Sequence, residues 1–144
     1  MLKRAHHIGL CVIDIDTCIS FWKDILGLKQ TADFNMKEEF LDFVQGKEDM
    51  DYRIVKFETP EGFMIELLQD RGHVVKPQIE NSLQAAGLRH FALEVTNVDE
   101  FYDKFLKRGY KTISAPATSK DKSMKLFFVR DPEENLIEIM QFQF

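Results

Sequence analysis

Residues 6–13 read HHIGLCVI, and residues 89–95 read RHFALEV. Each stretch is a short run rich in apolar side chains, a composition typical of a β-strand. In both stretches a histidine is followed by an apolar residue and then a small one, which aligns His7 with His90. This alignment indicates that the chain contains an internal repeat.

A helix is predicted after each of these two strands. The first helix spans residues 17–26, with Asp16 as its expected N-cap, and ends at Gly27, because glycine accepts the left-handed conformation beyond a last turn. The second spans residues 98–108 and ends at Gly109. Both carry an apolar stripe at helical spacing. The two halves of the chain therefore share the order strand, helix, glycine.

Further strands are predicted after each helix. In the first half they cover residues 28–34, 39–45, 52–58 and 63–69, and in the second half residues 110–114, 124–130 and 135–142. Residues 63–69 are a further arm in the first half, so the two halves differ in detail and no exact strand count is predicted. The shared order of strand, helix and further strands predicts an α+β fold built from two βαβββ modules.

The domain organisation follows from the repeat. Residues 70–88 are polar, contain Gly72 and Pro77, and are predicted to link the halves, with a short helix near residues 78–86 as an option. We expect a single domain over residues 1–144, with modules at 1–69 and 89–144.

Two glutamates interrupt apolar strands. Glu66 lies within FMIELL at residues 63–68, and Glu138 within LIEIM at residues 136–140. Apolar neighbours on both sides predict strands buried on both faces, and so buried carboxylates. A buried carboxylate costs several kcal/mol, as an order of magnitude, unless it is paired or bound to a metal. Each glutamate therefore needs a partner.

The histidines supply the other half of the pattern. One histidine and one glutamate occur at matching places in each half: His7 with Glu66, and His90 with Glu138. Any one of them alone is more often a core histidine or a salt-bridged glutamate, but the repeated pair favours a metal site. Two imidazoles and two carboxylates suit Zn, Ni, Co, Mn or Fe. His6 is the alternative to His7, and we expect it to point to the opposite face.

Bulk properties narrow the class of protein. The chain has 144 residues, 44% of them hydrophobic, and a net charge of −5, which suits one globular domain and gives nucleic-acid binding no electrostatic support. No apolar run is long enough to cross a membrane, and no signal sequence is visible, so a cytoplasmic protein is expected. Cys11, in an apolar run, is predicted to be buried, and Cys18, near a helix start, to be exposed.

Several longer motifs carry a resemblance to a known family. The chain resembles the vicinal oxygen chelate superfamily, which includes glyoxalase I, methylmalonyl-CoA epimerase, extradiol ring-cleavage dioxygenases, and fosfomycin- and bleomycin-resistance proteins. The matching stretches are His7–Leu10, Phe21–Leu28, Ile65–Leu67, Leu88–Val95 and Asp131–Glu138. One departure is Glu134, which stands where the family's last turn usually has glycine.

The resemblance implies a fold and a ligand set. The two modules would pair around a cleft that holds one divalent metal, and the four ligands would be His7, Glu66, His90 and Glu138. A homodimer is also implied, with the metal site either within one chain or shared between two.

The resemblance also implies a reaction class. We expect a lyase or isomerase of glyoxalase I type, closest to glyoxalase I and the acyl-CoA epimerase, acting on a small molecule with vicinal oxygens. Glu66 or Glu138 would take a proton next to a carbonyl, through a metal-stabilised enediolate. One alternative is an iron-dependent extradiol dioxygenase, for which His73 and Tyr110 are the extra candidates. The other is a non-catalytic small-molecule-binding resistance protein.

Overall fold

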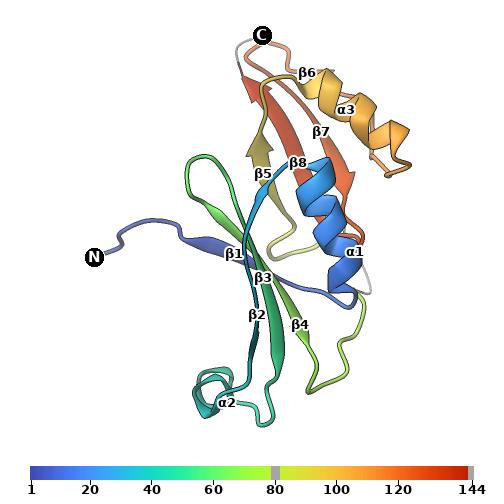
Figure 1. Cartoon of the computed structure of the whole chain (residues 1–144). Coiled ribbons are helices and arrows are strands. Elements are labelled where there is room, and N and C mark those ends of the chain that lie inside the picture. Colours follow the sequence, from blue (N-terminus) through green and yellow to red (C-terminus); the bar gives the residue numbers. More distant parts are fainter. Residues whose placement is uncertain (79–81, 143–144) are drawn as a thin grey trace. The chain divides into compact units, whose positions relative to one another are not determined.

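The computed structural model describes residues 1–78 and 82–142 (Figure 1). The chain divides into two compact units, an N-terminal unit (Met1–Pro77) and a C-terminal unit (Gln78–Phe144). Among the described residues, every helix is too short or too polar to span a bilayer.

The N-terminal unit contains one four-stranded sheet. Its strands lie in the order β1-β4-β3-β2, with β1 parallel to β4 and the other neighbours antiparallel. The elements in chain order are β1 (His7–Cys11), α1 (Ile15–Ser20), the π-helical turn η1 (Phe21–Ile25), β2 (Lys29–Met36), α2 (Glu39–Gln45), β3 (Tyr52–Glu58) and β4 (Met64–Asp70).

The C-terminal unit repeats this plan. Its sheet has the order β5-β8-β7-β6, and again the first pair is parallel and the others antiparallel. The elements are β5 (His90–Glu94), α3 (Val98–Lys107), β6 (Ala117–Thr118), β7 (Met124–Arg130) and β8 (Leu136–Phe142). The predicted α+β class with two βαβββ modules is confirmed, and Figure 1 shows the strands of each unit.

Each sheet is buried on the face that its helix covers. In the N-terminal unit α1 contacts β4, where Ile65 and Leu67 are fully buried. In the C-terminal unit α3 contacts β7 and β8, and the rings of Phe105 and Phe127 pack edge to face with centroids 5.8 Å apart. Strand residues between these buried ones point to the other face.

Residues 39–45, predicted to be a strand, form helix α2 instead. Leu41 is the buried residue of this helix and packs in a small cluster with Met50, Tyr52 and Ile54. The helix ends at Gly46, whose φ of 63° is left-handed. Phenylalanines and a valine favour a strand locally, but the packing of Leu41 against Tyr52 and Ile54 is a tertiary contact, and such contacts override local preference.

The first predicted helix begins two residues earlier than expected. Asp14, and not Asp16, is the N-cap, because its Oδ1 accepts a 3.1 Å hydrogen bond from the Thr17 N–H. After Ser20 the helix widens into η1, where the Leu26 N–H donates to the Phe21 carbonyl. The glycine end is confirmed, with Gly27 at φ 73°.

The two cysteines have the reverse of their predicted exposures. Cys18 is fully buried on the inner side of α1, while Cys11 is exposed on β1. Cys11 shares a sheet face with the residues opposite the helix, which explains its accessibility, since neighbouring strand residues alternate between faces. Neither cysteine forms a disulfide.

In the C-terminal half, the predicted helix is confirmed and one predicted strand is not. Helix α3 starts after Asn97, whose side chain accepts from the backbone N–H groups of Asp99 and Glu100. Residues 110–114 form an isolated bridge, Thr112 to Val129, in place of the predicted strand. The edge strand beside β7 in this sheet is the two-residue β6, which pairs with Lys125 and Leu126 of β7.

The region predicted as a linker lacks regular structure in its described part after β4. The optional helix near residues 78–86 overlaps residues 79–81, which lie outside the described residues, and residues 83–87 form turns and bends.

Candidate metal centre

The first histidine–glutamate pair lies on the parallel strands β1 and β4. Gly9 is the register partner of Glu66, and His7 is the partner of Met64, two residues earlier on each strand. Because alternate residues share a face, His7 and Glu66 project from the same side of the sheet. His7 Nε2 lies 3.7 Å from Glu66 Oε2. The sequence prediction that these two residues meet is supported within this unit.

The second pair repeats this geometry in the C-terminal unit. Ala92 is the register partner of Glu138, and His90 stands two residues before it on β5. His90 Nε2 lies 3.2 Å from Glu138 Oε2. The same two atoms therefore face each other, at the same register, in both units.

The burial predicted for the two glutamates was wrong. Their side chains keep 14% (Glu66) and 15% (Glu138) of their exposure, and the two histidines keep 43% and 39%. Strands β4 and β8 bury one face tightly, through residues such as Ile65 and Ile137, and leave the glutamate face partly open. Apolar neighbours on that face do not imply full burial.

The side chains around the two pairs differ. In the N-terminal unit Lys56 Nζ lies 2.9 Å from Glu66 Oε1. His6 also contacts this pair, with its Nδ1 2.7 Å from His7 Nδ1. The expectation that His6 points to the opposite face was wrong, because β1 begins at His7 and strand alternation does not extend to His6.

In the C-terminal unit an aromatic ring takes the place of the lysine. Phe128 is the register partner of Glu138, as Lys56 is of Glu66. The rings of Phe128 and His90 pack edge to face, with centroids 5.2 Å apart and planes at 86°. Sequence reasoning missed both residues. Hairpin symmetry would have found them, since residues 56 and 66 lie equally far from Glu61 in the turn, and 128 and 138 equally far from Glu133.

The residues of the two pairs fit a divalent metal. Two ligand atoms on one Zn²⁺, each at about 2.0–2.2 Å, lie roughly 2.9–3.5 Å apart. The 3.2 Å pair falls within this range, and the 3.7 Å pair needs only a small side-chain shift. Imidazole nitrogen and carboxylate oxygen are suitable donors. Each unit by itself supplies two such donors, and residues 1–78 and 82–142 contain no metal-binding group of three or more His, Cys, Asp or Glu.

The extra dioxygenase candidates have structural roles. His73 was assigned to the polar linker, and its Nδ1 lies 2.9 Å from Asp70 Oδ2 in a turn that closes β4. Tyr110 follows α3, and its ring packs edge to face with Phe105, with centroids 6.2 Å apart.

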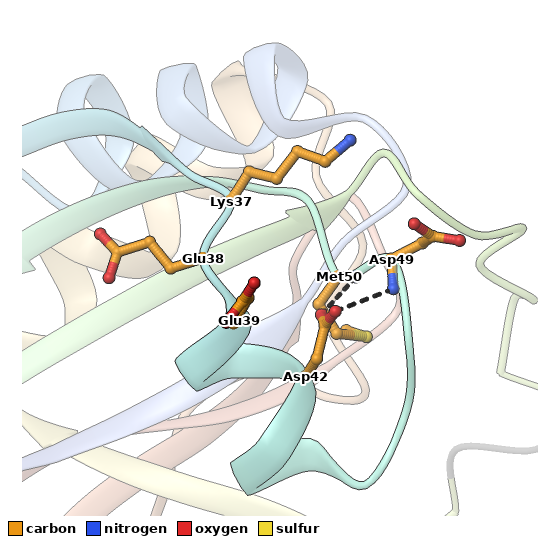
Figure 2. A pocket seen from close by; sticks show the side chains of 6 residues that line it. All are labelled: Lys37, Glu38, Glu39, Asp42, Asp49 and Met50. Atoms are coloured by element: carbon orange, nitrogen blue, oxygen red, sulfur yellow. Dashed lines mark hydrogen bonds between the residues drawn. The ribbon is translucent and has the colours of Figure 1, made fainter.

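A small hollow lies beside helix α2 (Figure 2). Its volume is about 200 Å³, below the usual range for ligand pockets, and its lining is mostly acidic. Asp42 uses both carboxylate oxygens inside the fold, accepting from the backbone N–H groups of Asp49 and Met50 at 3.2 and 2.9 Å. Through these hydrogen bonds Asp42 holds the loop after α2 closed, which is a structural role.

A charged network ties β3 to its neighbours on the face opposite Lys56. Arg53 donates two hydrogen bonds to Asp33 and one to Asp16. The hydrogen bond from Arg53 lowers the pKa of the Asp33 carboxyl, and the two carboxylates raise the pKa of the guanidinium. This pairing holds the edge strand β2 to β3.

The repeated fold and the paired histidines and glutamates define a class of protein. The chain belongs to the Glyoxalase/Bleomycin resistance protein/Dioxygenase superfamily, whose profile matches residues 4–139. The resemblance stated from the sequence is thereby confirmed.

Individual relatives show how far the similarity extends. The chain is 32% identical over 132 residues to YraH of Bacillus subtilis, covering 92% of this chain and 93% of the relative. It is 30% identical over 138 residues to a probable lactoylglutathione lyase of Synechocystis, covering 94% and 92%. A glyoxalase family protein from Bacillus cereus shares the fold, with a TM-score of 0.90, 23% identity, and 100% and 97% coverage.

Proposed function

We propose that this protein is a divalent-metal-dependent lyase or isomerase of the glyoxalase I type, acting on a small molecule with vicinal oxygens. The observation that carries the proposal is the repeated pair, in which a histidine Nε2 faces a glutamate Oε2 at the same register of both sheets. Similarity to a probable lactoylglutathione lyase supports this class.

In this proposal His7, Glu66, His90 and Glu138 hold one metal ion. The bound metal would act as a Lewis acid that stabilises negative charge developing on a substrate oxygen. Glu66 or Glu138 would take the proton from the carbon next to a carbonyl. The carbon–hydrogen bond breaks, its electron pair stays on the substrate, and the proton moves to a carboxylate oxygen before it is returned. Both carboxylates keep some exposure, 14% for Glu66 and 15% for Glu138, through which a substrate would reach them.

We further propose that the two modules, residues 1–69 and 89–144, act as one functional domain in a cytoplasmic homodimer. The site then lies within one chain or between two. Mixing His7→Ala with His90→Ala protein separates these arrangements, after exchange of subunits. A site shared between chains regains metal binding at one of the two sites of the mixed dimer. A site within one chain regains none, because each chain carries a broken pair.

The first test is the metal content of the purified protein by elemental mass spectrometry. We expect about one zinc, nickel, cobalt or manganese ion per chain, as structural and catalytic sites of this donor type bind one ion. His90→Ala should lose the metal. His73→Ala, a matched histidine substitution at a residue that pairs with Asp70, should keep it.

Other outcomes of this experiment favour other functions. Iron as the bound metal would support the ring-cleavage dioxygenase, which needs open coordination positions on iron. A fosfomycin resistance protein, FosX of Listeria monocytogenes, has the same fold with a TM-score of 0.67 and 16% identity. Protein that takes up no metal would contradict the proposed lyase or isomerase and favour a small-molecule-binding protein. Assays with hemithioacetals and acyl-CoA thioesters follow a positive result.

A further inference from the structure

The two carboxylates of the proposed metal site have different electrostatic surroundings. In the N-terminal unit, Glu66 of β4 faces a cation on the neighbouring strand β3, with Lys56 Nζ 2.9 Å from its Oε1. In the C-terminal unit, the equivalent register position holds Phe128, whose ring carries no charge. The ion pairs of the described residues give Glu138 one partner, His90.

The position of Lys56 is well defined by its packing. Its side chain keeps 29% of its exposure, and its Nζ lies 5.6 Å from the centre of the Phe34 ring on β2. Strand β3 lies between β2 and β4 in the sheet, so both sides of the lysine are bounded by paired strands. Lys56 is therefore held beside the Glu66 carboxylate by the sheet itself.

A metal ion and an ammonium group compete for the same negative charge. Lys56 lies on Oε1, while Oε2 faces His7. This division leaves Glu66 one oxygen for a metal. It also brings a positive charge close to the place that a cation would occupy, which is unfavourable at short range. Glu138 carries neither restriction.

We propose that Lys56 is a positioning residue that makes Glu66 the weaker of the two carboxylate ligands, and hence the one that exchanges between metal and substrate. This inference rests on the proposed metal site. It assigns different roles to two glutamates that the repeat presents as equivalent: Glu138 as the lasting ligand, and Glu66 as the carboxylate released for proton transfer.

The test measures the dissociation constant for Zn²⁺ alone, by competition with a chromophoric chelator. Lys56→Met removes the charge and keeps an apolar stem against Phe34. We expect it to tighten Zn²⁺ binding by roughly fivefold, the effect of one partly exposed ion pair. Lys56→Arg keeps the charge and should bind Zn²⁺ like the unsubstituted protein.

Lys125→Met is the matched control for net charge. Lys125 lies on β7, on the opposite face of its sheet from Glu138, and pairs with Asp99 of α3 at 2.6 Å. The Lys125→Met substitution removes one positive charge from the chain without changing either histidine–glutamate pair, so the dissociation constant for Zn²⁺ should stay unchanged.

A second comparison tests the ranking of the glutamates. Glu138→Gln should weaken Zn²⁺ binding more than Glu66→Gln, and this difference should disappear in the Lys56→Met background. Zinc binding that depends on His90 but is the same in Lys56→Met and Lys125→Met would overturn this inference alone. Failure of the unsubstituted protein to bind any metal would overturn the proposed function, and this inference with it.

Discussion

Two neighbouring histidines, His6 and His7, contact each other at the start of β1. Their Nδ1 atoms are 2.7 Å apart, and the rings meet edge to face at 80°. A hydrogen bond between two neutral imidazoles needs the proton on one of these nitrogens. If His7 carries it, the lone pair of His7 lies on Nε2, the atom that faces Glu66. His6 would then fix the tautomer that a metal requires.

Replacing His6 therefore tests its role as an orienting neighbour. We expect His6→Ala to weaken Zn²⁺ binding by about 10-fold, the lower end of the loss for such partners, because the pair is exposed. His7→Ala, which removes a proposed ligand, should weaken binding by more than roughly 100-fold. Chelator competition measures both. Equal losses in the two variants would instead make His6 a ligand itself.

For single residues, the sequence predicted which histidine pairs with which glutamate, but not which side chains lie beside each pair. The repeat was enough to match His7 with Glu66 and His90 with Glu138, because the two halves share a hydrophobic pattern and such a pattern sets strand register. It did not predict that Lys56 accompanies one glutamate and Phe128 the other. Those contacts run across the hairpins, and the residues of one strand do not specify the residues opposite them on a partner strand.

The turn between β7 and β8 shows how one element tolerates an unexpected residue. Glu134 adopts a φ of 65°, a left-handed conformation that favours glycine. The turn is held by the buried Asp131, whose Oδ1 accepts from the backbone N–H groups of Glu133 and Asn135. Burial raises the pKa of the Asp131 carboxyl, although these hydrogen bonds act in the opposite direction. The hydrogen bonds to Asp131 thus stabilise a turn conformation that glycine would adopt without strain.

This strain can be measured with two substitutions at Glu134. Both Glu134→Gly and Glu134→Ala remove its 3.5 Å contact with Arg130, so their difference isolates the backbone conformation. We expect the glycine variant to have a free energy of unfolding about 1 kcal/mol higher than the alanine variant. Urea denaturation provides the measurement. An alanine variant as stable as the glycine variant would show that the turn carries no such strain.

Among the elements, helix α2 was the largest error of the sequence analysis. Residues 39–45 are rich in aromatic and branched side chains, and three of them, Phe40, Phe43 and Val44, are exposed in the folded unit. Local composition favoured a strand, while the buried contact of Leu41 with Tyr52 and Ile54 is long-range. In contrast, helix α3 was predicted correctly because its cap, stripe and glycine end are all local signals.

At the scale of the whole molecule, internal repetition made the fold predictable. Aligning residues 6–13 with 89–95 predicted two copies of one βαβββ plan, and the structure adds that the first pair of strands is parallel in each copy. The repeat also predicts that the function needs both units. Each unit brings together one histidine and one glutamate, and two donors are too few for a tightly held ion, which usually has three or four protein ligands.

The proposed site therefore predicts how many metal ions bind per chain, and that the effects of His7→Ala and His90→Ala on metal binding are not additive. Calorimetric titration should give one Zn²⁺ per chain, and His7→Ala and His90→Ala should each abolish tight binding. The double variant should be no worse than either single variant, because both residues serve one ion. At 100 times its dissociation constant, Zn²⁺ should stabilise the unsubstituted protein by about 2.7 kcal/mol and leave the single variants unchanged. Two ions per chain, with each variant losing only one, would instead mean that each unit binds its own metal, and the repeated pairs would then be two sites.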